Sequence, residues 1–216
     1  NPLLLQGAVS DQVETTSIKE TAAETPPAQD APIEEKPSIA VLPFDNMSGD
    51  EEQEYFADGI TEDLITDLSK ISGLLVIARN SVFTYKGTAV NVPDVCRELG
   101  VRWALEGSVR KSGNRVRITA QLIDGDTGGH LWADRFDRNL DDIFAVQDEV
   151  TAEIVGALKV KISVDEQARL SHHSTQNVQA YDNSLQAREL IMGGTESGVV
   201  KARILLQRGL DDDPEF

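Results

Sequence analysis

Residues 37–44 read Pro-Ser-Ile-Ala-Val-Leu-Pro-Phe, and this apolar run decides the fold class of the chain. A strand that is covered on both faces of a sheet is a continuous hydrophobic run, whereas a half-exposed strand alternates apolar and polar residues. Pro43 has no backbone N–H group, so we expect the strand to end there. Residues 74–78, Leu-Leu-Val-Ile-Ala, repeat the pattern and predict a second buried strand.

A helix is expected between these two strands. Ser48 and Glu51 have the spacing of a capping box, which predicts the start of that helix. Its apolar residues then recur every three or four positions, as on one helix face: Phe56, Ile60, Leu64, Leu68 and Ile71. Residues 93–99 predict a second, short helix that ends at Gly100.

The pattern changes to alternation after Gly100. Apolar and polar residues alternate over 101–110 and 115–122, and Ser112-Gly113-Asn114 joins the two segments as a hairpin turn. A second turn over 124–129 leads to a strand at 130–136, and an amphipathic helix follows over 143–158. The predicted fold class is α/β (α+β), with a mixed sheet flanked by helices in the order β-α-β-α-β-β-β-α, followed by a C-terminal helical hairpin.

Composition divides the chain into three predicted parts. Residues 1–36 hold four of the eight prolines and no apolar period, which predicts a disordered linker, with Leu3–Leu5 as an alternative stub of a membrane helix. Residues 37–162 form the predicted α/β domain. Residues 163–216 predict a polar connector at 165–173 and helices over 178–192 and 198–210. Ala202, Leu206 and Gly209 have the spacing of a tetratricopeptide unit, so this part is either the start of a repeat array or a simple helical hairpin.

The net charge excludes some classes of partner. The chain of 216 residues has 20 Lys+Arg and 37 Asp+Glu, which gives a formal net charge of -17 at pH 7. Nucleic acid and anionic membrane surfaces would repel such a chain, so we expect this piece to bind neither. No run of 18 apolar residues occurs. Because the chain begins with Asn1, we expect a piece of a longer protein, with membrane contact only through an upstream anchor.

Sequence motifs for catalysis or metal binding are lacking. No glycine-rich phosphate loop and no Gly-x-Ser-x-Gly nucleophile elbow occur. Asp124-Gly125-Asp126 resembles the opening of a calcium loop, but Arg135 stands where a Glu is required, so we expect a hairpin turn. Cys96, the one cysteine, is expected to be a buried structural thiol. The three histidines lack the spacing of metal ligands: His130, His172 and His173. We predict no cofactor, no metal and no catalytic residue.

Two charged clusters each have two interpretations. Acidic residues crowd the stretch from Asp45 to Asp67 without any Lys or Arg before Lys70, which predicts a solvated helix face or a site for a cation or a basic partner. Arginines follow the predicted strands at Arg102, Arg110, Arg115, Arg117, Arg135 and Arg138. They are expected to pair across strands with Glu106, Asp134 and Asp137, or to bind a small anionic ligand.

Five phrases, in order, carry a resemblance to a known family. They are residues 37–44, Tyr-Phe-Ala-Asp-Gly-Ile-Thr-Glu-Asp-Leu at 55–64, Ala-Arg-Asn-Ser at 78–81, Leu-Glu-Gly-Ser-Val-Arg at 105–110 and Gly-Gly-His-Leu-Trp-Ala-Asp-Arg-Phe at 128–136. Together they resemble the TolB-N-terminal-like (TolB-like) domain of bacterial signalling proteins over about 37–162. The resemblance implies a mixed sheet flanked by helices and no catalytic motif. In that family the domain commonly follows a class III adenylate/guanylate cyclase domain or a winged-helix domain, often after a membrane helix, and tetratricopeptide repeats follow it.

The prediction is a non-catalytic sensor or protein-interaction module of a larger bacterial signalling protein, with a cyclase-type catalytic domain upstream. The alternative is a stand-alone envelope lipoprotein or assembly factor. The expected partners are proteins that bind to the α/β domain and to the repeats. A second copy of the chain, in a homodimer, is an alternative partner. The expected location is the periplasmic side of a membrane-anchored protein, with the cytoplasm as the other option. The predicted partner or ligand surface contains Arg79, Asn80, Arg110, Trp132 and Arg135, of which Trp132 is alternatively a core residue.

Overall fold

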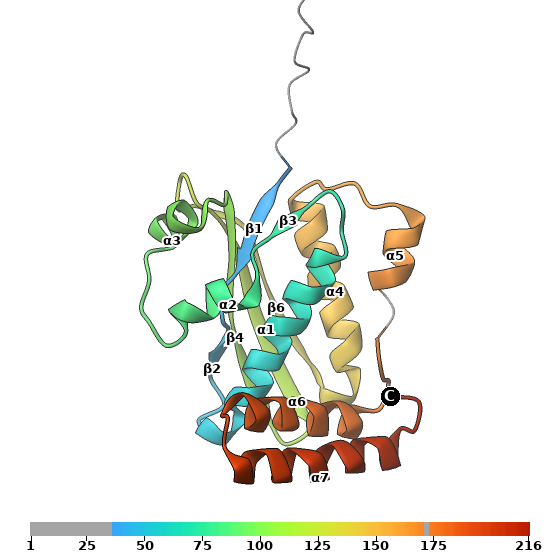
Figure 1. Ribbon diagram of the computed structural model, residues 1–216. Coiled ribbons are helices and arrows are strands. Elements are labelled where there is room, and N and C mark those ends of the chain that lie inside the picture. Colours follow the sequence, from blue (N-terminus) through green and yellow to red (C-terminus); the bar gives the residue numbers. More distant parts are fainter. Residues whose placement is uncertain (1–35, 171–172) are drawn as a thin grey trace, which may run out of the picture. The chain divides into compact units, whose positions relative to one another are not determined.

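A six-stranded mixed sheet forms the centre of the structure, a computed structural model that describes residues 36–170 and 173–216 (Figure 1). β1 (Ser38–Val41) lies between β3 (Leu75–Val76) and β4 (Trp103–Ser112) and is parallel to both. β4, β5 (Arg115–Asp124) and β6 (His130–Asn139) form an antiparallel meander. The strand order is β3-β1-β4-β5-β6, and β2 (Asp45–Asn46) pairs with β4 in parallel.

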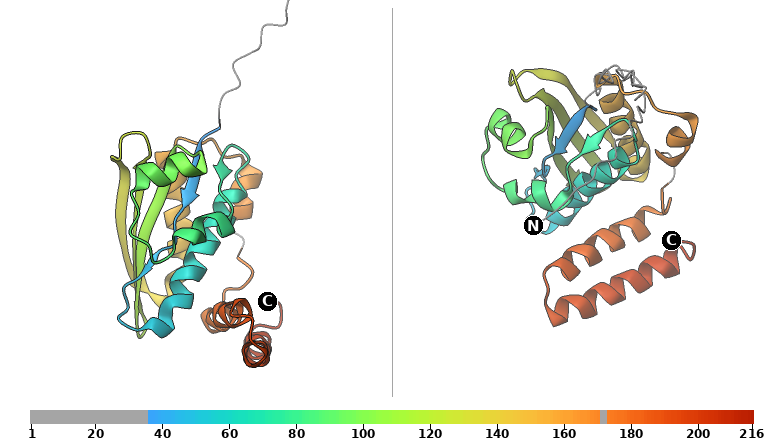
Figure 2. Two further views of the ribbon diagram at one scale, coloured as in Figure 1. Left: turned by 60° about the vertical axis from the view of Figure 1, so that its left-hand side comes forward. Right: turned by 45° about the horizontal axis from the view of Figure 1, so that its top comes forward.

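Long helices cover one face of the sheet, shorter helices lie in the connections, and a helical pair follows at the C-terminal end of the chain (Figures 1 and 2). α1 (Glu54–Ser69) and α4 (Ile143–Ala157) cover the same face of the sheet. The shorter helices are η1 (Glu51–Gln53), α2 (Arg79–Val82), η2 (Phe83–Tyr85), α3 (Val92–Leu99), η3 (Leu140–Asp142) and α5 (Val164–Leu170). α6 (Val178–Met192) and α7 (Glu196–Asp212) form a C-terminal pair.

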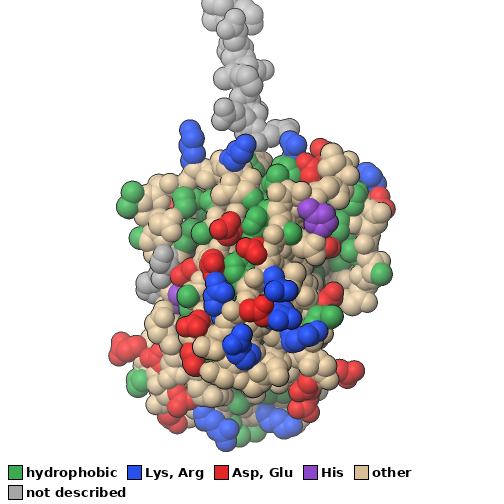
Figure 3. Space-filling view, turned by 180° about the vertical axis from the view of Figure 1, so that it is seen from behind, with side chains coloured by type: hydrophobic (Ala, Val, Ile, Leu, Met, Phe, Trp, Pro, Cys, Tyr) green, Lys and Arg blue, Asp and Glu red, His purple; other side chains and the backbone are tan. Residues whose placement is uncertain are grey.

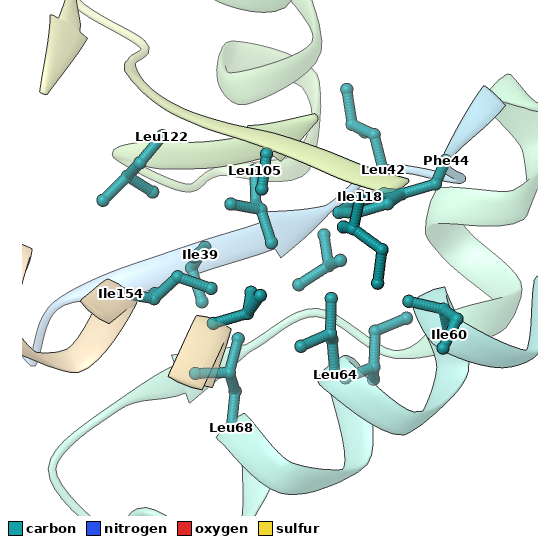
Figure 4. Packing of buried hydrophobic residues seen from close by; sticks show 14 of the residues in the cluster. Ile39, Leu42, Phe44, Ile60, Leu64, Leu68, Leu105, Ile118, Leu122 and Ile154 are labelled. Atoms are coloured by element: carbon teal, nitrogen blue, oxygen red, sulfur yellow. The ribbon is translucent and has the colours of Figure 1, made fainter. Parts of the chain in front are cut away.

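The hydrophobic core lies between the sheet and the two covering helices (Figure 4). Ile39, Leu105, Ile118 and Leu122 project from the strands, and they meet side chains of α1 and α4, among them Leu64. These side chains are almost wholly buried. Because burying one such side chain stabilises a fold by about 1.5–3 kcal/mol, this layer supplies most of the driving force for folding.

The predicted fold class is confirmed, including the helical pair at the C-terminal end. The short helix α3 also follows its sequence signals. The Asn91 side chain accepts the N–H of Asp94 at its start, and Gly100 closes it with φ 67°, a conformation that glycine adopts without strain. α2 and η2 were not predicted, because their apolar residues are too few to show a helical period.

The predicted capping box at Ser48 and Glu51 is wrong. Asp50 caps η1 instead, and its carboxylate accepts the N–H of Glu52 at 2.9 Å. The Ser48 hydroxyl accepts the N–H of Lys111 on β4 at 2.9 Å. The loop before α1 is therefore attached to the sheet, which moves the start of the helix away from Ser48.

The polar connector predicted at 165–173 is also wrong over its first part, since α5 forms there. Its Leu170 is buried, and the Glu166 carboxylate accepts the N–H of Ser72 at 2.7 Å and of Ser163 at 2.8 Å. A helix this short has no room for an apolar period, so composition alone could not reveal it. No helix among the described residues has the length and apolar character needed to cross a membrane.

Candidate interaction site

The face of the sheet that α1 and α4 leave uncovered is rich in charged side chains (Figure 3). Residues two apart on a strand share a face, so the pairing register places Arg110 opposite Arg117 and Thr119 opposite Arg135 on this side. Asp137 lies opposite Arg117. Figure 3 shows this side from behind, with Lys and Arg side chains interspersed among Asp and Glu.

Local partners hold most of these arginines. The Asp137 carboxylate accepts a bond from Arg117 Nε at 2.6 Å and lies 3.1 Å from Arg135 Nε. The Arg117 guanidinium therefore keeps the pKa of Asp137 below its usual range. Arg110 Nε donates to the Met47 carbonyl at 2.9 Å. The predicted cross-strand pairing is confirmed for Arg117 with Asp137, whereas the contact of Arg135 with Asp137 lies within β6.

A cleft of about 360 Å³ opens on the same side, between the 85–90 segment and strands β4 and β5. Its polar lining includes the carboxyl groups of Asp45 and Glu106, the hydroxyls of Ser108 and Thr119, and the Gln121 amide. Neither Lys, Arg nor His lines it. Such a lining suits hydroxyl or ammonium groups and disfavours phosphates.

The structure distributes the five predicted surface residues over three places. Arg110 and Arg135 share the uncovered face, on the two strands that flank β5. Trp132 lies opposite Leu122, half-buried against the core, with its ring 6.3 Å from that of Phe136.

Arg79 and Asn80 lie in α2. Arg79 pairs with Glu62 at 2.9 Å and stacks 3.8 Å above the Phe83 ring, while Asn80 is exposed. Arg110 and Arg135 thus share the sheet face, Arg79 and Asn80 share α2, and Trp132 lies apart from both pairs.

The junction between α1 and α6 contains polar contacts that the sequence did not reveal. Tyr55 donates its hydroxyl to Asp182 at 2.8 Å, and Lys111 Nζ lies 2.6 Å from the same carboxylate. Gly59 leaves room for Leu185, because a Cβ at this position would lie 2.6 Å from Leu185 Cδ1. The helical pair is thus attached to both the sheet and α1.

Asp63 forms the second half of this junction. Its carboxylate accepts the Tyr181 hydroxyl at 2.5 Å and the Gln147 amide at 2.9 Å. Burial raises the pKa of Asp63 above its usual range. Arg188 on α6 lies 3.3 Å from Glu62.

These contacts correct the interpretation of the acidic run as a solvated helix face for its part within α1, whereas Asp45, Asp50, Glu51 and Glu52 are exposed. Asp63 and Glu62 bind side chains of α6, while Asp58 and Glu54 bind Lys86. Within α1, the basic partners of these carboxylates include Lys86 and Arg188 of this chain. The sequence could not show this, because Tyr181 and Arg188 lie more than one hundred residues from α1 along the chain.

The structure also places the remaining residues that the sequence offered as candidates for chemistry. Asp124 accepts the N–H groups of Asp126 and Thr127, which confirms the hairpin turn over the calcium loop. Cys96 is buried, and burial raises the pKa of its thiol to about 11. Within the described residues, no group of three or more His, Cys, Asp or Glu is placed to hold a metal ion. His173 lies 3.1 Å from Asp148, and His172 falls outside the described residues.

A family described as "HilA/YgeH-like transcriptional regulator, second domain" matches residues 34–153. The chain is also 59% identical over 193 residues to a protein of Rhizobium meliloti (strain 1021) named "Putative adenylate cyclase 3". That match covers 89% of the chain but only 32% of the relative, so the chain spans about a third of the length of the relative.

Two solved structures are similar to part of this chain. TolB from Acinetobacter baumannii is 18% identical with a TM-score of 0.42, over 56% of this chain and 28% of TolB. Lipoprotein GNA1162 from Neisseria meningitidis is 20% identical with a TM-score of 0.42, over 58% of this chain and 99% of that protein.

Proposed function

The chain belongs to the family of HilA/YgeH-like second domains, and from this premise we propose that it is a non-catalytic sensor and protein-interaction module of a larger bacterial signalling protein. The proposal rests on two similarities, one to a family of domains and one to a longer protein. The same residues resemble the second domain of transcriptional regulators and a third of a protein named as a cyclase. A domain that is similar to parts of proteins with two different activities, transcriptional regulation and nucleotide cyclisation, is suited to regulating such activities rather than to performing either of them.

The junction between α1 and α6 supports a role in transmission. A partner that binds the α/β part changes the helical pair only if the two parts are mechanically joined. Asp63–Tyr181 and Lys111–Asp182 join them through partly buried polar contacts. We propose that a signal received on the sheet reaches α6 and α7 through these contacts.

The proposal includes three finer points. The helical pair is the first unit of a tetratricopeptide array, because α7 leaves Val199, Val200 and Ile204 about half exposed and so offers an apolar face to a further helix. The parent protein is of the adenylate/guanylate cyclase type, with its catalytic domain upstream. A membrane anchor precedes the module and places it on the periplasmic side.

The experiment compares the full-length parent protein with a version that lacks residues 36–216, at matched expression. Cyclic nucleotide formed from ATP and from GTP is measured for both, and for the 216-residue chain alone. We expect the chain alone to form none, and the deletion to retain catalysis at an altered basal rate. Product formed by the chain alone, or a parent gene that encodes neither a cyclase nor a DNA-binding domain, would contradict the proposal. A lipobox cysteine directly before Asn1 would instead favour the envelope lipoprotein.

A further inference from the structure

β6 is a long edge strand. It is the last strand in the order, spans ten residues and pairs with β5 on one side only. The left view of Figure 2 shows it at the rim of the sheet. Within the described part of the chain, no other strand or loop donates a main-chain hydrogen bond to its outer side. An open edge of this length is a template for pairing with another strand.

The main-chain groups of Arg135 and Asp137 face this open side. Thr119, which lies opposite Arg135, directs its carbonyl toward Gly107 of β4, so its backbone does not bond to β6. The outward groups are capped by neighbouring side chains. The Asp134 carboxylate accepts the N–H of Arg135 at 2.6 Å, and Arg138 Nη1 donates to the Asp137 carbonyl at 3.1 Å.

The charge sequence of β6 is self-complementary about Phe136. Residues 134–138 read Asp-Arg-Phe-Asp-Arg, and the same five residues in reverse carry the opposite charge at every charged position. An antiparallel copy with Phe136 opposite Phe136 therefore sets Asp134 against Arg138 and Arg135 against Asp137, each pair on one face of the sheet. Two-fold symmetry repeats both pairs.

We propose that two copies of this chain associate edge to edge through β6 in this register, forming one continuous sheet. In the dimer the Arg135 N–H donates to the Asp137 carbonyl of the partner subunit, and the Asp137 N–H donates to the Arg135 carbonyl of the partner subunit. Asp134 and Arg138, released from their caps, pair with each other across the interface. In the single chain, the capping side chains thus occupy the positions that the second strand occupies in the dimer.

Charge also selects the register. A slip by two residues in one direction places Arg135 against Arg135, and in the other direction Asp137 against Asp137. Like charges directly opposite each other destabilise an antiparallel pair, so both slipped registers are disfavoured. This interface does not depend on the signalling role proposed above, because it uses neither the α1–α6 junction nor an upstream domain.

The test is sedimentation equilibrium of the 216-residue chain over a wide range of protein concentration. We expect the average molar mass of the wild type to rise from that of a monomer to that of a dimer as the protein concentration increases. Asp134→Arg and Arg138→Asp each place like charges at two symmetric positions and lower the association constant about tenfold or more. The double variant with both changes restores opposite charges and regains wild-type association. Glu149→Gln removes the 3.1 Å contact between Arg138 and Glu149 and is the matched control, which should associate as the wild type does.

Three results would overturn the proposal. The wild type could stay monomeric at every concentration, the single variants could dimerise as tightly as the wild type, or the double variant could fail to recover association. Asp134 and Arg138 are exposed, so all variants should keep the wild-type circular dichroism spectrum and unfolding midpoint. The two single variants change the net charge in opposite directions, and the double variant restores it. Loss of association in both single variants and recovery in the double variant would therefore report on the interface rather than on the net charge.

Discussion

The hydroxyl of Tyr181 on α6, a buried residue, donates to the partly buried carboxylate of Asp63 on α1 at 2.5 Å. Tyr181→Phe removes this donor and leaves a buried carboxylate with one bond fewer. We expect the free energy of unfolding to fall by about 1–3 kcal/mol, measured by urea denaturation. Asp63→Asn is the control, because it keeps an oxygen that can accept the Tyr181 hydroxyl and removes the buried charge. A Tyr181→Phe protein as stable as the wild type would show that the contact does not hold α6.

Glu166 makes the docking of α5 dependent on pH. Hydrogen bonds from Ser163 and Ser72 lower the pKa of Glu166 from about 4.5 to about 2. Since the folded pKa lies below the unfolded value, the contribution to stability is complete above pH 4.5 and is lost as the pH falls toward 2. Unfolding midpoints of the wild type and of Glu166→Gln, compared from pH 6 down to pH 2, should differ most at pH 6 and converge in acid. A constant difference across that range would contradict the assignment.

Gly107 has no room for a side chain. A Cβ there would collide with the Thr119 carbonyl and lie 2.7 Å from the Phe44 ring. We expect Gly107→Ala to destabilise the fold by about 1–3 kcal/mol, as overpacking of a core does. Gly156→Ala in α4 is the matched control, because nothing lies within 4 Å of its Cβ position, and alanine should stabilise that helix slightly. Thermal unfolding of the two variants should move in opposite directions.

Cys96 is the single thiol of the chain, so its reactivity reports on one position. Burial and the raised pKa of about 11 leave very little thiolate at neutral pH. We expect a disulfide reagent such as Ellman's reagent to label the folded chain slowly and the chain in denaturant at once. Rapid labelling of the folded chain would show that α3 leaves the sheet readily.

The fold class was predictable from sequence because its signals are local. Residues 38–41 form a strand as a continuous apolar run, and Val116, Ile118 and Ala120 are buried on alternate positions of β5. The α1–α6 junction was not predictable, since its contacts join residues far apart in the sequence. Tyr181 lies in α6. The other polar residues of this helix do not indicate which of its faces is buried.

The candidate surface was predictable in part for the same reason. Arg110 and Arg135 share a face because strand register follows from two short turns. Arg79 lies apart from them in α2, where it pairs with Glu62 on α1, a contact that no local pattern encodes.

The central position of β1 has a mechanical consequence. Hydrogen bonds hold this strand on both sides, from Leu75 to the Pro37 carbonyl at 2.8 Å, from Ile77 to Ile39 at 3.0 Å and from Leu42 to Leu105 at 2.8 Å. Tension applied through the segment before Lys36 acts along the strand and loads all of these bonds in shear. They must break together rather than one after another. A pull on Lys36 along β1 would therefore be resisted by main-chain hydrogen bonds on both sides of the strand, whereas the contacts described between α6 and the α/β part are made by side chains.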